Sequence, residues 1–205
     1  PGYPVLGEEM DEGAQRAALR QFASGMWCID PIDGTTNFAT GFPAWAISVA
    51  LIKDGRALLG IVYDPGRDEC FTAQADAGAW LNGTLLRLGQ EARELDTSVA
   101  AIDFKRLAPT LACRLASEPP YRSQRNLGSV ALDWCWLAAG RCQLYLHGGQ
   151  RLWDYAAGAL VLREARGAAC ALDGEELYAP MLAPRSVCAA ANNATLAAWR
   201  GWLEM

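Results

Sequence analysis

Residues 27–38, with the sequence WCIDPIDGTTNF, carry the side chains of this chain that are best suited to chemistry. Asp30 and Asp33 stand three positions apart, separated by Pro31 and Ile32. Two carboxylates about 4 Å apart repel each other by roughly 4 kcal/mol at an effective dielectric constant of about 20, so such a pair needs a cation or a proton between them. Carboxylates offer only oxygen ligands, which suit Mg²⁺ or Mn²⁺ better than Zn²⁺. The pair therefore predicts a site for a hard divalent cation.

The backbone around this pair predicts a strand that leads into a tight turn and a helix. Residues 27–29 are mostly apolar and indicate a buried strand. Pro31 has no N–H to donate to a neighbouring strand, so we expect the strand to end at Asp30. Gly34 permits a sharp reversal, and residues 35–37 are typical of a helix start, whose free amides bind phosphate oxygens. A turn without any chemistry is the alternative that this segment leaves open on its own.

Two distant segments add further acidic residues. Glu8 and Glu9 follow an apolar pair near the start of the sequence, and Asp154 follows Trp153 where a helical pattern opens. Together with residues 30–38, these segments resemble the three metal-site motifs of the inositol monophosphatase family, within a larger group that includes fructose bisphosphatases. The resemblance extends from residue 5 to about residue 200.

The resemblance implies a set of Mg²⁺ ligands. One ion would be held by Glu8, Asp30 and the backbone carbonyl of Ile32, and a second by Asp30, Asp33 and Asp154, with Asp30 as the bridge. Two or three ions are expected, and Mn²⁺ can replace Mg²⁺. In such a site, with ions about 3.5–4 Å apart, one ion lowers the pKa of the attacking water and another neutralises the leaving oxygen. Taken alone, Asp154 also fits a helix N-cap worth about 1 kcal/mol.

The same resemblance implies the catalytic and phosphate-binding groups. Thr35 would orient the attacking water, Glu8 would act as its base, and Asp33 would complete the catalytic set. The amides of Gly34, Thr35 and Thr36 would hold the phosphate. Attack would be in line and without a phosphoenzyme.

The resemblance says less about the rest of the substrate. In the inositol monophosphatases, a Gly-Thr-Ala segment at a helix start and an acidic residue after the next strand contact the sugar hydroxyls. Gly128, Ser129 and Val130 match the segment, but His147 stands at the acidic position and leaves the identity of the substrate open. We predict that His147 contacts the ligand, with a hydrogen bond to nearby backbone as the alternative, and that residues 148–151 form a loop beside it.

Several conspicuous residues are assigned to structure. We expect Glu9 to face solvent or to support the metal ligands, and Glu164 to act as a structural hydrogen-bonding group within a helix. Trp134, Trp136 and Trp153 fit a core or a subunit interface better than a stacking platform for a ligand.

The fold class predicted from these patterns is α/β. The resemblance further implies a layered α-β-α-β-α sandwich of the inositol monophosphatase and fructose-1,6-bisphosphatase type. We expect residues 1–205 to form a single domain with two lobes: a metal-binding lobe with an antiparallel sheet over about residues 1–90, and an α/β, substrate-side lobe over about residues 100–205. The sequence opens with Pro1 instead of Met, so we expect that a native N-terminal pair of helices is missing.

Hydrophobic periodicity predicts individual elements. The expected strands cover residues 5–9, 45–52, 57–63, 69–74, 78–83, 142–146, 168–172 and 186–190. The expected helices cover residues 104–115, 129–139 and 153–165, with a last helix capped by residues 192–193. Residues 11–23 fit a helix or a surface loop, Asp54 and Gly55 indicate a hairpin, and residues 86–99 are expected to connect the lobes.

Composition restricts the class of protein further. The formal net charge of −5 argues against direct nucleic-acid binding, and no apolar run reaches the roughly 20 residues of a membrane span. The seven cysteines form no C-x-x-C pair and indicate buried, reduced thiols in the cytoplasm. A zinc site is disfavoured because His147 is the only histidine.

The resulting hypothesis is a Mg²⁺-dependent phosphomonoesterase for a small phosphorylated polyol such as inositol 1-phosphate. Fructose 1,6-bisphosphate, histidinol phosphate and 3′-phosphoadenosine phosphate are alternative substrates. A regulatory member of the family that binds another protein is an alternative of a different class. The resemblance also implies a homodimer and sensitivity to lithium.

Overall fold

The computed structural model describes residues 2–175 and 177–204. In this part of the chain the first seven strands form one sheet, called sheet A, in sequential order: β1 (Val5–Gly7), β2 (Met26–Asp33), β3 (Ala46–Lys53), β4 (Arg56–Asp64), β5 (Glu69–Gln74), β6 (Gly78–Leu81) and β7 (Thr84–Leu86). β1 pairs with β2 in parallel, and the later neighbours pair antiparallel. Strands β3 to β6 lie where hydrophobic patterning predicts them, whereas β7 was not predicted.

A second sheet, called sheet B, is built from later residues. In sequence order its strands are β8 (Val99–Asp103), β9 (Ser123–Arg125), β10 (Leu144–Gln150), β11 (Ala168–Ala171) and β12 (Arg185–Ala190). Their spatial order is β11-β12-β10-β8-β9, with parallel pairing of β10 with β8 and of β8 with β9. Sequence patterning indicates β10, β11 and β12 but misses β8 and β9.

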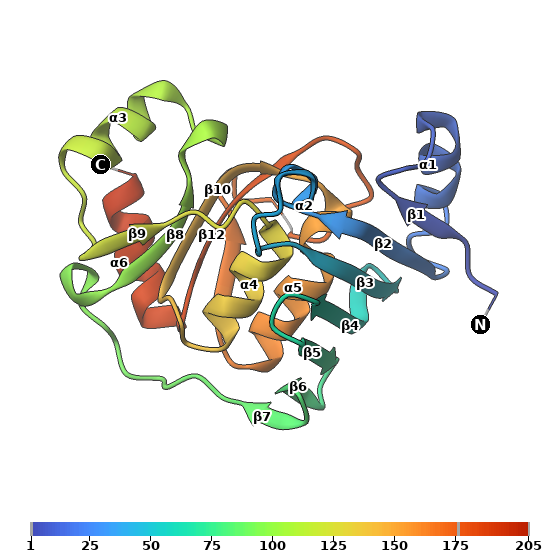
Figure 1. Cartoon of the computed structure of the whole chain (residues 1–205), viewed down its shortest axis with the longest axis horizontal. Helices are drawn as coiled ribbons and strands as arrows, with labels where there is room; N and C mark the ends of the chain where they lie inside the picture. Colours follow the sequence, from blue (N-terminus) through green and yellow to red (C-terminus); the bar gives the residue numbers. More distant parts are fainter. Residues whose placement is uncertain (1, 176, 205) are drawn as a thin grey trace.

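The helices separate and cover the two sheets (Figure 1). They are α1 (Glu12–Leu19), α2 (Thr35–Thr40), α3 (Pro109–Ser117), α4 (Val130–Ala138), α5 (Leu152–Glu164) and α6 (Asn193–Leu203), with short 3₁₀ turns η1 (Leu95–Thr97) and η2 (Phe104–Arg106). Helices α4 and α5 lie between the sheets, while α3 and α6 pack on the far side of sheet B. This layered arrangement confirms the predicted α/β class, and the additional N-terminal helices stay a prediction.

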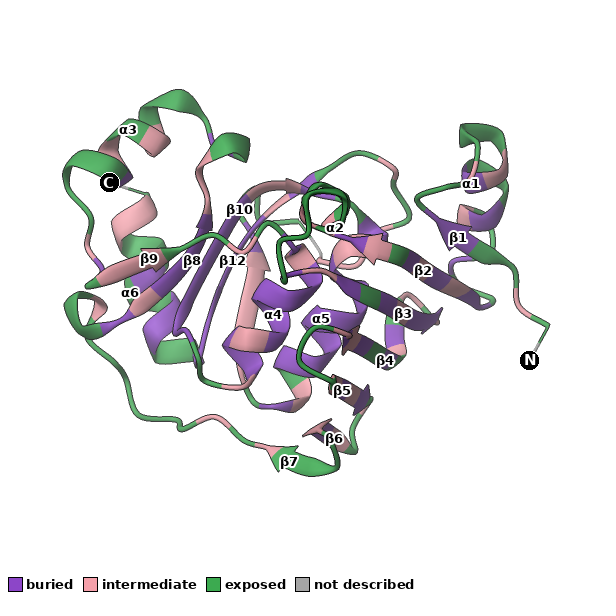
Figure 2. Ribbon diagram, in the orientation of Figure 1, coloured by how far each residue is buried: buried purple, intermediate pink, exposed green. Residues whose placement is uncertain are grey.

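The strands of sheet A alternate between a buried and an exposed face, as strand geometry requires (Figure 2). Along β3, Ala46 and Ser48 are 0% and 1% exposed, whereas Ile47 between them is 37% exposed. The buried face packs on α5, where Gly60 of β4 allows backbone approach: a Cβ there would lie 3.0 Å from the Ala157 carbonyl oxygen. The sheet therefore presents its ligand-bearing strand β2 against a fixed helix layer.

The predicted hairpin between β3 and β4 is confirmed. Asp54 and Gly55 both have positive φ, at 53° and 75°, as a two-residue turn between twisted antiparallel strands requires. Lys53 pairs with Arg56 across this turn. The turn lies at the opposite end of β3 from Ala46, which pairs with Asp33.

The prediction that β2 ends at Asp30 is wrong. The strand extends to Asp33, but its pairing with β3 is irregular between Asp30, opposite Ser48, and Asp33, opposite Ala46. Pro31 has no N–H to donate, so the ladder omits it and resumes two residues later, which produces a bulge. The bulge is the local feature that sets the spacing of the two aspartates.

Strand β10 is longer than predicted, and this corrects the expected loop at residues 148–151. Gly148 and Gly149 belong to the strand, which continues to Gln150. A Cβ at Gly148 would lie only 1.7 Å from the carbonyl oxygen of Arg106, so a close backbone contact with η2 requires glycine here. The glycines therefore serve strand packing instead of loop flexibility.

The helix predicted over residues 104–115 is divided in two. Residues Phe104–Arg106 form η2, capped by Asp103, whose side chain accepts a hydrogen bond from the Lys105 amide. The α-helix begins at Pro109, because proline is favoured in a first helical turn and disfavours helical geometry in the residue before it.

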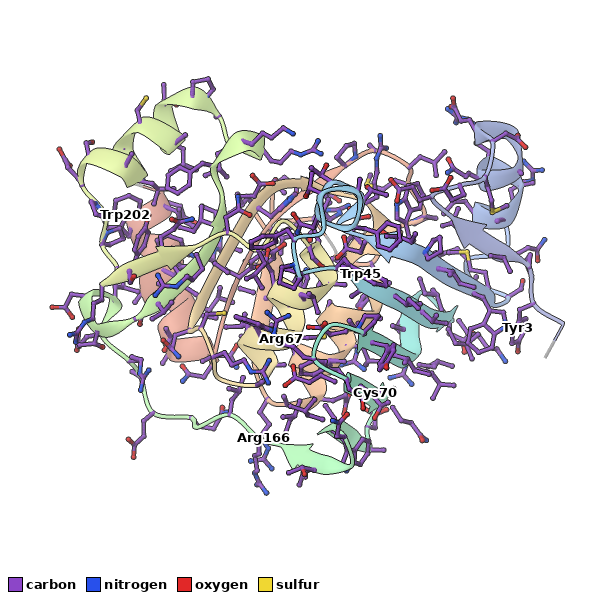
Figure 3. All side chains as sticks on the ribbon, viewed as in Figure 1. Tyr3, Trp45, Arg67, Cys70, Arg166 and Trp202 are labelled. Atoms are coloured by element: carbon purple, nitrogen blue, oxygen red, sulfur yellow. The ribbon has the colours of Figure 1, made fainter. Side chains whose placement is uncertain are left out.

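The cores on either side of sheet B are rich in aromatic side chains. Trp134 and Trp153 are 0% and 6% exposed and lie in the core between the sheets, as predicted. On the far side of sheet B the ring of Trp202, labelled in Figure 3, stacks on Trp199 with centroids 5.8 Å apart. The guanidinium carbon Cζ of Arg114 in α3 lies 4.2 Å from the centroid of the Trp202 ring, so α3 contacts α6 here.

The cysteines agree only in part with the expectation of buried, reduced thiols. All seven cysteines are free thiols, and four of them are buried as predicted: Cys28, Cys135, Cys142 and Cys188. Cys70 and Cys170 are partly exposed and Cys113 is exposed, which corrects the expectation for these three.

None of the helices in the described part of the chain combines the length and the apolar character needed to cross a membrane.

Candidate functional site

Three aspartates converge where sheet A meets the first turn of α5. One carboxylate oxygen from each of Asp30, Asp33 and Asp154 lies within 4.8 Å of the other two. Asp30 and Asp33 flank the bulge of β2, and the hydroxyl of Ser48 donates to the Trp153 carbonyl at 3.2 Å, which fixes the start of α5 against β3. The structure therefore brings together three residues that the sequence motifs predict as metal ligands.

Glu8 lies at the same end of sheet A. Strand β1 runs parallel to β2 with Gly7 opposite Ile29, so Glu8 follows β1 beside the position where Asp30 lies on β2. Gln15 of α1 donates to the backbone carbonyls of Gly7 and Glu8 and holds this segment. Glu9, expected to face solvent or to support the metal ligands, is exposed and does not line the pocket in the described residues.

Each aspartate of the cluster has one oxygen engaged by hydrogen bonds from protein groups, which are local for Asp30 and Asp154 and long-range for Asp33. The Ile32 amide donates to Asp30 Oδ1 at 2.9 Å, and the Arg151 amide donates to Asp154 Oδ2 at 2.7 Å. Asp33 Oδ2 accepts from the Ala131 amide at 2.8 Å and from the Ser129 hydroxyl. Among the described residues, the second oxygen of each carboxylate has no such partner, so three oxygens are available to a shared ligand.

Asp154 lies in both environments that the sequence presents as alternatives, although it stands at position N3 of α5 and the N-cap itself is Arg151. Its Oδ2 accepts from the amide of Arg151 as in a capping box, and the residue also belongs to the aspartate cluster. The cap fixes the orientation of the carboxylate. Capping of α5 therefore does not exclude metal binding.

Burial and mutual repulsion make this cluster unfavourable when it is fully ionised. Burial, followed by the charges of Asp33 and Glu8, raises the pKa of Asp30 to about 7. Burial raises the pKa of Asp33 to about 6, despite its hydrogen bonds from Ser129 and Ala131. The pKa of Asp154 is also raised, first by burial and then by Asp33. A divalent cation would relieve this repulsion, and the all-oxygen donor set fits Mg²⁺.

The N-terminus of α2 borders the carboxylates. Gly34, with φ of 93°, precedes the helix, and no side chain caps it. Asn37 donates to the carbonyls of Ala44 and Leu127 at 2.6 and 2.7 Å, which joins α2 to the segment before α4. Thr35 and Thr36 are exposed and line the pocket with Gly34. The first amides of α2 therefore lie beside the aspartate cluster.

The predicted substrate segment at the start of α4 also supports the aspartates. Gly128, Ser129 and Val130 line the pocket, but Ser129 is only 1% exposed. Its hydroxyl donates to Asp33 and accepts from the Leu132 amide at 3.4 Å, which caps α4. In the structure, Ser129 thus links a candidate metal ligand to the helix layer.

One pocket of about 350 Å³ contains both regions. All the predicted site residues except Ile32 line it. We call the side with Glu8, Asp30, Asp33 and Asp154 the carboxylate end. The opposite side, called the mixed-charge end, contains Asp103, Lys105, Arg106 and His147. Asn126 and Asp133 line the pocket as well; burial raises the pKa of Asp133 well above its usual range.

The mixed-charge end is the part that sequence reasoning largely missed. His147 was predicted, but its neighbours Asp103, Lys105 and Arg106 follow a strand, β8, that the hydrophobic pattern did not reveal. The available signal was the short apolar run of residues 99–102 ending in an aspartate, the same pattern that precedes Asp30.

His147 makes the backbone contact considered as an alternative, and it lines the pocket too. Its Nδ1 accepts from the Gly149 amide at 3.1 Å, and its Nε2 lies 3.3 Å from Asp103 Oδ2. Glu164, by contrast, accepts from the amides of Asp76 and Gly78 at 3.1 and 3.2 Å, as expected of a structural group.

The sequence is similar to those of known proteins. A sequence model described as the inositol monophosphatase family matches residues 1–201. The Nus factor SuhB of Escherichia coli K12 is 43% identical over 159 residues, which cover 74% of this chain and 58% of that protein. The Nus factor SuhB of Xylella fastidiosa is 36% identical over 180 residues, which cover 86% of this chain and 63% of the relative.

Solved structures show the same fold. A crystal structure of inositol monophosphatase II from Staphylococcus aureus has a TM-score of 0.84 and 29% identity, covering 100% of this chain and 75% of that one. A structure of inositol monophosphatase from Anabaena has a TM-score of 0.81 and 28% identity, covering 100% of this chain and 80% of that one. The chain thus spans about 58% to 63% of the length of the two curated relatives and a larger share of the solved structures.

Proposed function

The chain belongs to the inositol monophosphatase family, and on this premise we propose that it is a Mg²⁺-dependent phosphomonoesterase acting on a small phosphorylated polyol. The observation that carries the proposal is the cluster of Asp30, Asp33 and Asp154, in which one carboxylate oxygen from each lies within 4.8 Å of the other two, in the same pocket as the first residues of α2. A cluster of anions beside free amides suits a phosphate bound through cations.

The proposed ligand set follows the sequence motifs. Glu8, Asp30 and the Ile32 carbonyl would hold one ion, and Asp30, Asp33 and Asp154 a second, with Asp30 shared. Bound Mg²⁺ would supply activation of water and stabilisation of the leaving oxygen. The identity and number of the ions, and inhibition by lithium, are part of the proposal.

The residues of this chain would orient the reactants. Thr35 would hold the attacking water with its hydroxyl, and Glu8 would accept the proton as the water attacks. The amides of Gly34, Thr35 and Thr36 would bind the phosphate oxygens, which places the phosphorus between the water and the leaving group for in-line displacement. Asp33 would be held in position for this step by Ser129 and the Ala131 amide.

The substrate class draws support from similar proteins. A Staphylococcus aureus enzyme of this type, 29% identical to this chain, was crystallised with inositol monophosphate, and it was also crystallised with 2′-AMP. We place a polyol phosphate first because the pocket is lined by polar groups. Fructose 1,6-bisphosphate, histidinol phosphate and 3′-phosphoadenosine phosphate remain alternatives.

Phosphate release from a panel of these compounds, measured with and without Mg²⁺, tests the proposal. We expect Mg²⁺-dependent release from at least one polyol phosphate and loss of that release in Asp154→Asn. A panel without any release, from protein that binds Mg²⁺, would count against the enzymatic function.

A second candidate is a regulatory function through a protein partner in a homodimeric protein. The observation in its favour is that relatives with 36% to 43% identity are named Nus factor SuhB. The net charge of −5 does not favour direct nucleic-acid contact. Co-purification of one defined partner with both the wild type and Asp33→Asn, while only the wild type hydrolyses phosphate esters, would establish this function as separate.

A further inference from the structure

The mixed-charge end contains a side-chain pair that the proposed hydrolysis does not use. Asp103 ends β8, and His147 is its partner in the parallel pairing of β8 with β10. Their side chains meet, with His147 Nε2 3.3 Å from Asp103 Oδ2. Both line the same pocket as the aspartate cluster, so this pair faces the part of a substrate that lies beyond its phosphate.

The hydrogen bonds of His147 fix the position of its proton. The Gly149 amide donates to Nδ1 at 3.1 Å, so Nδ1 acts as an acceptor and carries no proton. In the neutral ring the proton then lies on Nε2, which donates it to Asp103. Both ring nitrogens are engaged, and the residue is only 4% exposed. His147 therefore has no ring nitrogen left for a ligand.

Asp103, in contrast, keeps free acceptor capacity. Its Oδ1 accepts from the Lys105 amide at 3.0 Å, and its Oδ2 accepts from His147. Each carboxylate oxygen can accept two hydrogen bonds, and the side chain is 19% exposed. The hydrogen bond from His147 also holds the pKa of Asp103 below its usual range. The carboxylate is thus ionised, fixed in orientation and accessible from the pocket.

We propose that Asp103 binds hydroxyl groups of the phosphorylated substrate, and that His147 is a positioning residue that holds this carboxylate toward the pocket. The inference rests on the proposed phosphatase function and assigns its substrate specificity to a named side chain. A carboxylate can accept one hydrogen bond on each oxygen from two adjacent hydroxyls. An ammonium group suits this end less well, because Lys105 and Arg106 line it and repel a cation.

The experiment compares substrates with and without hydroxyls beside the phosphate. Steady-state hydrolysis of myo-inositol 1-phosphate and of p-nitrophenyl phosphate is measured with Mg²⁺ for the wild type and Asp103→Asn. We expect KM for the inositol phosphate to rise roughly 10- to 100-fold, as for loss of a hydrogen bond to a charged group, with kcat within about twofold. Kinetics with p-nitrophenyl phosphate should stay unchanged, as should both activities of the control Asp96→Asn, an exposed residue outside the pocket.

His147 is tested by rescue. His147→Leu removes the donor to Asp103 and should raise KM for the inositol phosphate without a matching effect on p-nitrophenyl phosphate. His147→Gln retains an N–H donor on a side chain of similar reach and should recover most of the lost affinity. Equal effects of the Leu and Gln variants, or equal losses on both substrates, would mean that His147 serves folding alone.

Two outcomes separate the inference from the proposed function. If the wild type hydrolyses p-nitrophenyl phosphate but Asp103→Asn affects both substrates equally or neither, the function stands and the inference fails. Phosphoethanolamine serves as a third substrate. If Asp103→Asn loses activity only on phosphoethanolamine, the site recognises an ammonium group and the inference also fails. If the wild type hydrolyses nothing, the function fails, and the inference is decided by calorimetric titration of the protein with myo-inositol 1-phosphate in the presence of Ca²⁺. At least tenfold weaker binding by Asp103→Asn than by the wild type supports the inference. Equal binding by the two proteins, or no binding by the wild type, overturns it.

Discussion

The carboxylate end and the mixed-charge end of the pocket are held by different kinds of structure. At the carboxylate end, Asp30 and Asp33 are spaced by a bulge within one short segment, and Asp154 is oriented by its own helix cap. At the mixed-charge end, Asp103 and His147 meet only because β8 and β10 pair in parallel. At the first end the spacing of Asp30 and Asp33 is set locally, although Asp154 and the groups that hold Asp33 come from distant segments. The second end depends wholly on long-range pairing. We expect the carboxylate end to determine whether hydrolysis occurs and the mixed-charge end to determine which substrate is hydrolysed.

The largest effect is expected from removing a charge at the carboxylate end. Asp30→Asn should lower kcat for every substrate by roughly a thousandfold or more, because positioned charges of this type account for several kcal/mol of the barrier. The fold should persist, with an unchanged circular dichroism spectrum. Asp54→Asn, the same change in the exposed hairpin turn, is the matched control and should leave kcat unaltered. Wild-type turnover in Asp30→Asn at saturating Mg²⁺ would remove the proposed difference between the two ends.

Stability in the absence of divalent ions should depend on pH through the same aspartates. Their folded-state pKa values, about 7 for Asp30 and about 6 for Asp33, exceed the value of about 4 for an unfolded chain. The folded protein thus binds more protons, so this contribution to stability is full below about pH 4 and is lost as pH rises to about 7.

Mg²⁺ should restore that stability. At pH 8 and about 100 times its Kd, the ion should add about 2.7 kcal/mol, roughly 5 to 10 °C in Tm, and it should add less at pH 5. Thermal unfolding followed by circular dichroism provides the measurement. An equal shift at both pH values would show that the aspartates are not the binding groups.

A smaller effect is expected from the support of Asp33. Ser129→Ala removes the hydroxyl that donates to this carboxylate, and it should weaken Mg²⁺ affinity or activity about tenfold on all substrates. Ser129→Thr keeps the hydroxyl and serves as the control. A loss confined to polyol substrates would instead assign Ser129 to substrate recognition, as the sequence motif alone suggests.

The smallest effect should come from the exposed cation of the mixed-charge end. Arg106→Gln should raise KM by about two- to threefold at low ionic strength and by less at 0.5 M salt, because exposed charges are strongly screened. Lys53→Gln, at the far end of β3 from the site, controls for net charge. A salt-independent loss of kcat in Arg106→Gln would move this residue into the catalytic group.

The sequence could predict the Asp30 and Asp33 part of the carboxylate end because its information is contiguous, whereas Glu8 and Asp154 were predicted through the resemblance. Residues 30–34 contain both aspartates, the proline that forces the bulge and the glycine that starts α2. The start of α4 was equally readable, since a helix was predicted from residue 129 and α4 follows Ser129 as its N-cap. Even here, the end of β2 was placed too early, because a missing N–H interrupts pairing without ending the strand.

The mixed-charge end could not be predicted in the same way. Strand β8 has five residues and lies between the 3₁₀ turns η1 and η2, so neither period 2 nor period 3.6 develops along it. Its pairing with β10 places Asp103 beside His147, 44 positions later in the chain. The pairing register of two such distant segments cannot be predicted from the sequence of either segment alone. The resemblance placed His147 near the site, but the position of its proton and its contact with Asp103 came only from the structure.

Gly148 has a consequence for mutational tolerance. Any side chain there would begin 1.7 Å from the Arg106 carbonyl oxygen, so the strand cannot accept even alanine unless η2 moves. In a library that samples all amino acids at each position of the pocket, Gly148 should therefore retain almost only glycine. New substrate preferences would instead be selected at exposed positions such as Lys105 and Arg106, whose side chains can change without displacing backbone.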